Sequence, residues 1–387
     1  MSKKPPVPSL RGAVEPFIVM DVMRAAADRE HAGGRVVHME VGQPGAPTPK
    51  AVIAAAHAAL ADGRIAYTEA LGNRKLRASI AEHYREEHGL SVPMERIAIT
   101  TGSSAGFALV FLAAFDPGAR IAVTAPGYPA YRNLATALGL EVVEIPVSAD
   151  TRYVVTPEML ERIHAEKPLA GLLIASPANP SGTVMERHAF QALIAAAENL
   201  GIVFISDEIY HRLVYAGTAA TALQFSTDAI VVNSFSKYYC MTGWRIGWAV
   251  LPEPLIRPVE RIAQNLYISA PDISQRAAIA AFDATEELEA VKATYAKSRG
   301  LLLDRLPRIG FEELYPVDGA FYVYASVRRF SNDSVAFAAR MLAEAGVAAT
   351  PGPDFDRVRG YGFMRFSFAG TGADMAEAMD RLTHWLK

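Results

Sequence analysis

The stretch at residues 234–248 reads SFSKYYCMTGWRIGW and directly follows the β-branched run Ile230–Asn233. Such a run is typical of a buried strand, so the stretch begins at a strand's carboxyl end, where open α/β sheets bind ligands. Lys237 has the hydroxyl of Ser236 beside it and the guanidinium of Arg245 eight residues later. Most lysines are solvated surface charges, but an apolar surround and a positive neighbour favour loss of the ammonium proton. The stretch therefore predicts an activated lysine at the edge of an α/β sheet.

Outward from this stretch, β-branched runs alternate with Ala-rich segments of helical period. The predicted strands are Ile97–Thr101, Ile121–Thr124, Glu141–Pro146, Gly171–Ser176, Ile202–Asp207, Ile230–Ser234 and Gly247–Val250. The predicted helices are Ser103–Phe115, Ala130–Leu138, Pro157–Glu166 and His188–Leu200. This order predicts an α/β fold with a mostly parallel sheet covered on both faces. Alternation alone leaves an eight-stranded α/β barrel as a competing architecture.

Beyond about Phe282 the alternation gives way to another pattern. It predicts a long charged helix, a strand, a helix and a last strand, at Glu286–Arg308, Ala320–Val327, Asn332–Ala345 and Phe363–Phe368. This order is typical of a second, smaller α+β domain. The expected division is an N-terminal arm at 1–20, a large domain at 45–285, and a smaller domain built from 21–44 and 286–387. No Gly/Ser-rich linker separates the two domains, so we expect them to pack closely.

The composition is that of an ordinary globular protein. The 387 residues include 38 Lys+Arg and 41 Asp+Glu, a formal net charge of -3, so no global positive field recruits nucleic acid or an anionic membrane. The single cysteine, Cys240, excludes an intrachain disulfide and a multi-cysteine zinc site, and no metal site is expected. Residues Met1–Leu10 read as a flexible arm without a secretory core, and the longest apolar run, Phe107–Phe115, is shorter than the roughly 20 residues of a membrane span. We expect a cytoplasmic protein.

Three more polar clusters follow predicted strands. Residues 176–183 read SPANPSGT, where two prolines hold Asn179 in a rigid turn. Residues 206–210 read SDEIY and place Asp207 at the carboxyl edge of the sheet, where a half-buried carboxylate needs a cation or several donors. Capping a helix is the simpler alternative for this aspartate. Residues 100–106 read TTGSSAG, a turn whose N–H groups and hydroxyls suit a phosphate, although it is also a common helix cap.

The four clusters occur together in a known family. The segments SPANPSGT, SDEIY and SFSKYYCMTGWRIGW resemble those of the fold-type I, class I/II aminotransferases, which use pyridoxal 5′-phosphate (PLP). The similarity extends from residues 41–44 to residues 365–367, and the lysine segment is its most specific part. The resemblance implies a large domain with a mostly parallel sheet covered by helices and a smaller α+β domain. It also implies transfer of an amino group from an L-amino acid to a 2-oxo acid, by a ping-pong mechanism through an aldimine on Lys237.

The resemblance assigns roles to matching residues. Lys237 would bind PLP as a Schiff base and later move the proton between the substrate Cα and the cofactor C4′. Asp207 resembles the residue that pairs with the pyridine nitrogen and so keeps the ring an electron sink. Asn179 and Tyr210 resemble the donors to the cofactor's phenolic oxygen. Lys237, Asp207 and Tyr210 are thus the expected catalytic residues.

Other matching residues would hold the rest of the cofactor. The expected phosphate ligands are Ser103, Ser104, Ser234, Ser236 and Arg245, of which the arginine offers a planar fork to the dianion. Tyr128 resembles an aromatic residue that stacks on the pyridine ring, with a core aromatic as the simpler alternative. Tyr67 resembles a tyrosine that reaches the phosphate of the neighbouring subunit, so a homodimer with shared active sites is implied.

The expected substrates are a small amino acid and a 2-oxo acid. Arg365 resembles the arginine that binds the α-carboxylate through two parallel hydrogen bonds, and Gly42 would let the backbone approach that carboxylate, with Asn179 nearby. No second arginine for a side-chain carboxylate can be matched, which favours neutral or aromatic donors. The candidates for a side-chain pocket are Ile18, Tyr67, Tyr131, Tyr267 and Phe321.

Three other functions compete with transamination. The family also contains carbon–sulfur β-lyases with the same core residues, so elimination is the first alternative. Aminotransferase-like transcription regulators carry an added helix-turn-helix domain, for which a match that begins by about residue 41 leaves no room. A nicotinamide-dependent dehydrogenase would need a Gly-x-Gly-x-x-Gly turn after an early strand, and the sequence has none there. Transamination is the expected activity.

Overall fold

A computed structural model describes residues 6–387. The first half of the predicted flexible arm, residues 1–5, lies outside the described residues. A short 3₁₀ turn at Leu10–Gly12 is followed by helix α1 (Ile18–His31). The helix therefore begins within residues 1–20, the segment that was expected to be an N-terminal arm.

The core of the protein is an open sheet of seven strands. They are β2 (Ile97–Thr100), β3 (Arg120–Ala125), β4 (Glu141–Pro146), β5 (Gly171–Ala175), β6 (Val203–Asp207), β7 (Ile230–Ser234) and β8 (Gly247–Val250). Their order is β2-β8-β7-β6-β5-β3-β4, and β8 runs antiparallel to both of its neighbours while the other pairs are parallel. The prediction of an α/β fold with a mostly parallel sheet is confirmed, and the alternative of a closed barrel was wrong.

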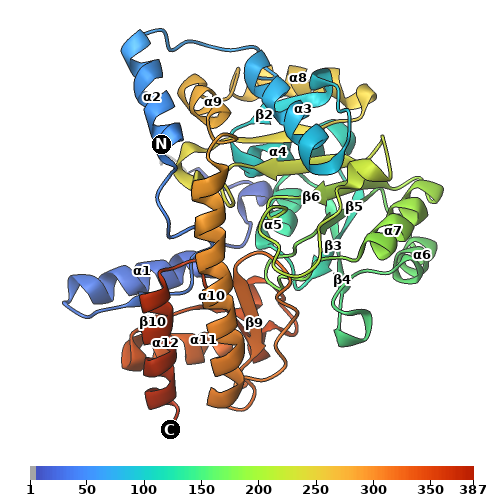
Figure 1. Ribbon diagram of the computed structural model, residues 1–387. Coiled ribbons are helices and arrows are strands. Elements are labelled where there is room, and N and C mark those ends of the chain that lie inside the picture. The colour runs from blue at the N-terminus through green and yellow to red at the C-terminus, as the bar shows by residue number, and fades with distance from the viewer. Residues whose placement is uncertain (1–5) are drawn as a thin grey trace, which may run out of the picture.

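Helices cover both faces of this sheet (Figure 1). Successive residues of a strand point to opposite faces, and on β5 Leu172 belongs to one buried cluster while Leu173 belongs to the other. The first cluster includes apolar residues of α6 (Pro157–Glu166), α7 (Arg187–Asn199), α2 (Lys50–Asp62), α3 (Arg74–His88) and α9 (Asp272–Ile279). The second includes those of α4 (Gly102–Ala114), α5 (Pro129–Ala137) and α8 (Glu253–Leu266). Helix α6 begins as its sequence indicates, because the Thr156 hydroxyl accepts a hydrogen bond from the Met159 N–H at 3.4 Å.

A second, smaller set of elements packs beside the main sheet. It contains the antiparallel sheet β11 (Thr350–Pro351), β12 (Phe363–Ser367) and β9 (Tyr322–Ser326), and the parallel pair β1 (Val37–His38) and β10 (Val347–Ala348). The helices here are α1, α11 (Ser334–Arg340), which continues as a π-helical turn at Met341–Ala345, and α12 (Gly372–Trp385). Figure 1 shows the long helix α10 (Thr285–Ile309) running from the neighbourhood of α9 down to β9 and α12.

The predicted division into domains stays a prediction, although the strands are distributed as it requires. All seven strands of the main sheet lie within 97–250, and those of the two small sheets lie at 37–38 and 322–367.

None of the helices in the described part of the chain combines the length and hydropathy that a bilayer crossing demands.

Candidate active site

A cavity of about 420 Å³ opens where the small sheets meet the carboxyl edge of the main sheet. Its walls include Ser103 after β2, Asn179 after β5, Asp207 at the end of β6 and Lys237 after β7. Carboxyl ends of neighbouring parallel strands meet at one edge of a sheet, which is why these separate clusters converge. A volume of this size is typical of small-molecule and cofactor sites.

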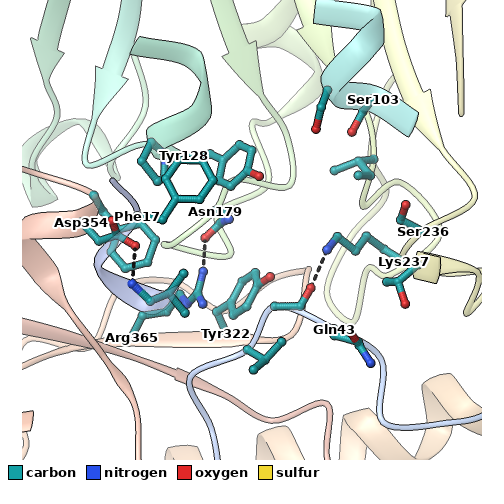
Figure 2. Close-up of a pocket in the computed structure, with 18 of the residues that line it drawn as sticks. Phe17, Gln43, Ser103, Tyr128, Asn179, Ser236, Lys237, Tyr322, Asp354 and Arg365 are labelled. Carbon is teal, nitrogen blue, oxygen red and sulfur yellow. Dashed lines mark hydrogen bonds between the residues drawn. The ribbon is translucent and has the colours of Figure 1, made fainter. Parts of the chain in front are cut away.

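Lys237 points into the cavity from the turn after β7 (Figure 2). Its Nζ donates a hydrogen bond to the carbonyl oxygen of Gly42, which the second set of elements brings to the opposite wall. Burial lowers the pKa of Lys237 to about 8, and the positive charges of Arg365 and Arg245 act in the same direction. The side chain can therefore become a neutral amine at moderately alkaline pH, as a lysine nucleophile requires.

Asp207 is a buried carboxylate at the end of β6. Its Oδ2 accepts a hydrogen bond from the Tyr131 hydroxyl and its Oδ1 accepts one from the Ile209 N–H at 3.1 Å. Burial raises the pKa of Asp207 to about 6, while these two bonds and the charge of Lys237 oppose that rise. No helix begins at this aspartate, since a turn follows β6, so helix capping is not its role. A carboxylate held in this way can pair with a cationic N–H group of a ligand.

Tyr131, a candidate for a side-chain pocket, lines the cavity, and its hydroxyl orients Asp207. The ring of Tyr128 meets that of Tyr131 edge-on at 5.4 Å, and both line the cavity. In Figure 2 the Tyr128 ring lies on the wall that faces Lys237. A flat aromatic wall of this kind can support a planar ring.

A group of donors suited to phosphate lines one end of the cavity. Ser103 and Ser104 lie in the first turn of α4 and line the cavity, as do Ser236 and Arg245. Gly102 has a φ of +72°, and a Cβ there would clash with the Arg245 guanidinium, so the glycine lets the cation lie over the helix N-terminus. Hydroxyls, helix N–H groups and a guanidinium together favour a dianion.

Ser234 lies beneath this group and is not on the cavity wall. Its hydroxyl donates to Ser236 Oγ at 2.9 Å and to the Ile246 carbonyl at 3.0 Å, two alternatives for one proton. The structure therefore places Ser234 as a support for Ser236, and direct contact with a phosphate stays a prediction.

Arg365 forms the other end of the cavity, on β12. Its guanidinium donates to Asn179 Oδ1 at 3.1 Å and to the Glu40 carbonyl at 2.5 Å. The group also lies 4.3 Å from the ring centroid of Tyr322 and 4.7 Å from that of Phe355, and its Nε has no partner. A planar cation fixed between two rings can bind a carboxylate with little loss of conformational freedom.

Position 42 favours glycine, because a Cβ there would clash with the hydroxyl of Tyr322. That hydroxyl lies 2.8 Å from the hydroxyl of Tyr210, a second buried residue of the wall. The sequence did not point to Tyr322, although its position beside the other aromatic residue of the GAFY segment could have suggested a packed wall.

The remaining wall is mostly apolar, and most of it was not predicted. It is formed by Phe17, Val19 and Met20 at the start of α1, together with Phe355. Asp354 holds this helix in place, because its carboxylate accepts bonds from the Ile18 N–H at 2.9 Å and the Val19 N–H at 3.4 Å. The expected pocket residues Ile18, Tyr67, Tyr267 and Phe321 do not line the cavity.

Tyr67 lies on the surface with 79% of its area exposed, beside a groove formed with residues 269–273. Its predicted contact with a cofactor requires a second copy of the chain and stays a prediction.

The cavity fits PLP. The donors Ser103, Ser236 and Arg245 suit its phosphate and Asp207 suits its pyridine N–H. Lys237 is a partly buried amine that can bind its aldehyde. Arg245, Asp207 and Lys237 are held by different elements around one volume, so they match the separate ends of a single ligand.

Known proteins resemble the whole chain. Residues 35–382 match the family model described as aminotransferase class I and II. A valine–pyruvate aminotransferase from Mycobacterium tuberculosis is 50% identical over 382 residues, which cover 98% of each chain. An aspartate/prephenate aminotransferase from Thermus thermophilus is 32% identical, with 97% of each chain covered. The crystal structure of an aminotransferase from Mycobacterium tuberculosis superposes with a TM-score of 0.96 at 49% identity, over 99% of each chain.

Proposed function

Because this chain belongs to the class I and II aminotransferases and is a PLP-dependent enzyme of that family, we propose that it transfers the amino group of a neutral, apolar L-amino acid to a small 2-oxo acid. The observation that supports this proposal best is the placement of the partly buried amine of Lys237 opposite Arg365 in one cavity whose remaining wall is mostly apolar.

PLP supplies an aldehyde that binds an amine and a ring that accepts the electron pair released at the substrate Cα. Lys237 would hold the aldehyde and, once the substrate amine replaces it, would move the proton between the substrate Cα and the cofactor C4′. Asp207 would keep the pyridine nitrogen protonated, because a buried carboxylate favours a cation beside it. Asn179 and Tyr210 would donate hydrogen bonds to the phenolic oxygen.

The two substrates would bind in turn at the same place. Among the described residues of the cavity wall the cations are Lys237, Arg245 and Arg365, and the first two would bind the cofactor. Arg365 then serves both the amino acid and the oxo acid, so they compete for it. This is the arrangement that a ping-pong mechanism needs.

The substrate side chain would contact Phe17, Val19, Met20 and Phe355. The buried carboxylate of Asp354, which also lines the cavity, opposes a second negative charge on the substrate. An aspartate or glutamate side chain would lose its hydration there without gaining a cation. One relative bears the name valine–pyruvate aminotransferase, which agrees with a branched apolar donor and a short acceptor.

The donor preference can be measured on the purified enzyme with PLP and pyruvate. We expect kcat/KM for valine to exceed that for aspartate by at least about 100-fold, because an unpaired buried charge costs several kcal/mol. A preference for aspartate would contradict the proposed substrate class. Release of ammonia and pyruvate from a β-substituted donor without an acceptor would show elimination in place of transamination.

Replacing Arg365 by lysine should raise KM for the amino acid by roughly 10- to 100-fold, because a point charge cannot form both parallel hydrogen bonds. The change in kcat should be smaller. Arg340→Lys is a matched control, since Arg340 is an exposed arginine of α11 outside the cavity. A KM for the Arg365→Lys variant equal to that of the control would mean that the carboxylate binds elsewhere.

We also propose that the enzyme is a cytoplasmic homodimer in which Tyr67 of each chain completes the partner's site. Its large exposed ring and the apolar residues of the neighbouring groove, such as Ile65 and Ile273, support an interface there. The single cysteine and the net charge of -3 are compatible with a cytoplasmic location.

A further inference from the structure

Tyr322 contacts three groups of the site, although neither a sequence motif nor the proposed roles include it. It lies on β9, is 1% exposed and has its side chain in the cavity wall. Its hydroxyl is 2.8 Å from that of Tyr210, its ring is 4.3 Å from the Arg365 guanidinium, and its hydroxyl occupies the space that a Cβ at Gly42 would need. Figure 2 shows the ring between Arg365 and the Lys237 side of the cavity.

The proton count at the two tyrosines fixes the direction of their hydrogen bond. Each hydroxyl has one proton to donate. If Tyr210 donates its proton to the phenolic oxygen of PLP, as the proposed function requires, the bond between the hydroxyls must run from Tyr322 to Tyr210. Burial raises the pKa of Tyr322, so its hydroxyl stays protonated at neutral pH and can donate.

We propose that Tyr322 is a positioning residue with two separable parts, a hydroxyl that directs the Tyr210 proton toward the cofactor's phenolic oxygen and a ring that holds the Arg365 guanidinium in place. The hydroxyl acts at the cofactor and the ring acts at the substrate carboxylate. This inference rests on the proposed function for the identity of the ligand at Tyr210.

The effect of the Tyr322 hydroxyl on the bound cofactor can be measured without turnover. A hydroxyl that accepts a hydrogen bond is a stronger donor, so Tyr322 strengthens the bond from Tyr210 to the phenolic oxygen. A better stabilised phenolate lowers the pKa of the adjacent nitrogen in the lysine-bound cofactor. Tyr322 therefore lowers the pH at which the absorbance of the bound cofactor changes.

The test compares two substitutions of the same residue in the PLP-loaded enzyme. Tyr322→Phe removes the hydroxyl and keeps the ring, and it should raise the midpoint of the absorbance-against-pH curve by roughly 0.3 to 1 unit with little change in KM for the amino acid. Tyr322→Leu removes both parts, and it should show the same shift and also raise KM by roughly 3- to 30-fold through loss of the cation–π contact.

Tyr324→Phe is the matched control. Tyr324 lies two residues along the same strand, is equally buried, has a hydroxyl without a partner and is not on the cavity wall. We expect its midpoint and KM to equal those of the unmodified enzyme.

Two results would overturn the inference. One is a midpoint in Tyr322→Phe that matches the Tyr324→Phe control, and the other is an equal rise of KM in Tyr322→Phe and Tyr322→Leu. If the leucine variant fails to fold, the phenylalanine variant still decides the role of the hydroxyl. Failure of the unmodified enzyme to use any amino acid would contradict the proposed function, whereas the pH titration needs only bound PLP and tests Tyr322 separately.

Discussion

Replacing Lys237 by alanine should lower kcat by at least about 10⁴-fold, because the change removes both the covalent attachment and the proton carrier. PLP should still bind through the donors around Ser236 and Arg245. The measurement is a single turnover with valine, together with mass spectrometry after borohydride reduction, which adds the cofactor's mass to the protein only where a lysine bond exists.

Lys167→Ala is the control for this experiment, since Lys167 is an exposed lysine paired with Glu141. Its turnover and its reducible cofactor bond should equal those of the unmodified enzyme. Normal turnover in Lys237→Ala would remove the basis of the proposed mechanism, and a reducible bond in that variant would place the attachment at another residue.

Replacing Asp207 by asparagine should lower kcat by about 10²- to 10³-fold, because the neutral amide cannot stabilise positive charge on the pyridine nitrogen in a buried site. The affinity for PLP should fall much less, since the phosphate donors are untouched. The two quantities are obtained from steady-state rates and from fluorescence titration of the cofactor-free protein.

Tyr131→Phe tests the orientation of the Asp207 carboxylate without removing its charge. It removes the hydrogen bond to Oδ2 and leaves the negative charge, so we expect a smaller loss than in Asp207→Asn. An Asp207→Asn variant with normal kcat would show that the carboxylate only stabilises the fold of the turn after β6.

The main sheet could be predicted from sequence because its strands are short and rich in β-branched residues, and because segments of helical period separate those from β2 to β6. The predicted strands Glu141–Pro146, Ile230–Ser234 and Gly247–Val250 agree with the structure to the residue. Strand order could not be predicted, since it depends on the insertion of β8 between β2 and β7, which local patterns do not record. The two-residue strands β1, β10 and β11 are too short to show any period.

The site was predictable to the extent that it follows strands of the main sheet. Lys237, Asp207 and Asn179 converge because parallel strands share a carboxyl edge. Tyr322 and the apolar wall at Phe17 were missed because they reach the cavity from other elements, through packing of segments far apart in the chain. The same reason explains the placement of Tyr131, whose role depends on its contact with a residue 76 positions away.

If this cavity binds PLP at Lys237 and transfers an amino group to it, the bound cofactor must change form when an amino acid is added. The most direct measurement is the absorption spectrum of the PLP-loaded enzyme before and after addition of valine alone, with no oxo acid present. We predict conversion of the lysine-bound cofactor to its amine form, with one equivalent of the 2-oxo acid of valine released, and reversal on addition of pyruvate. A spectrum that changes with none of the amino acids, apolar or acidic, would contradict the account.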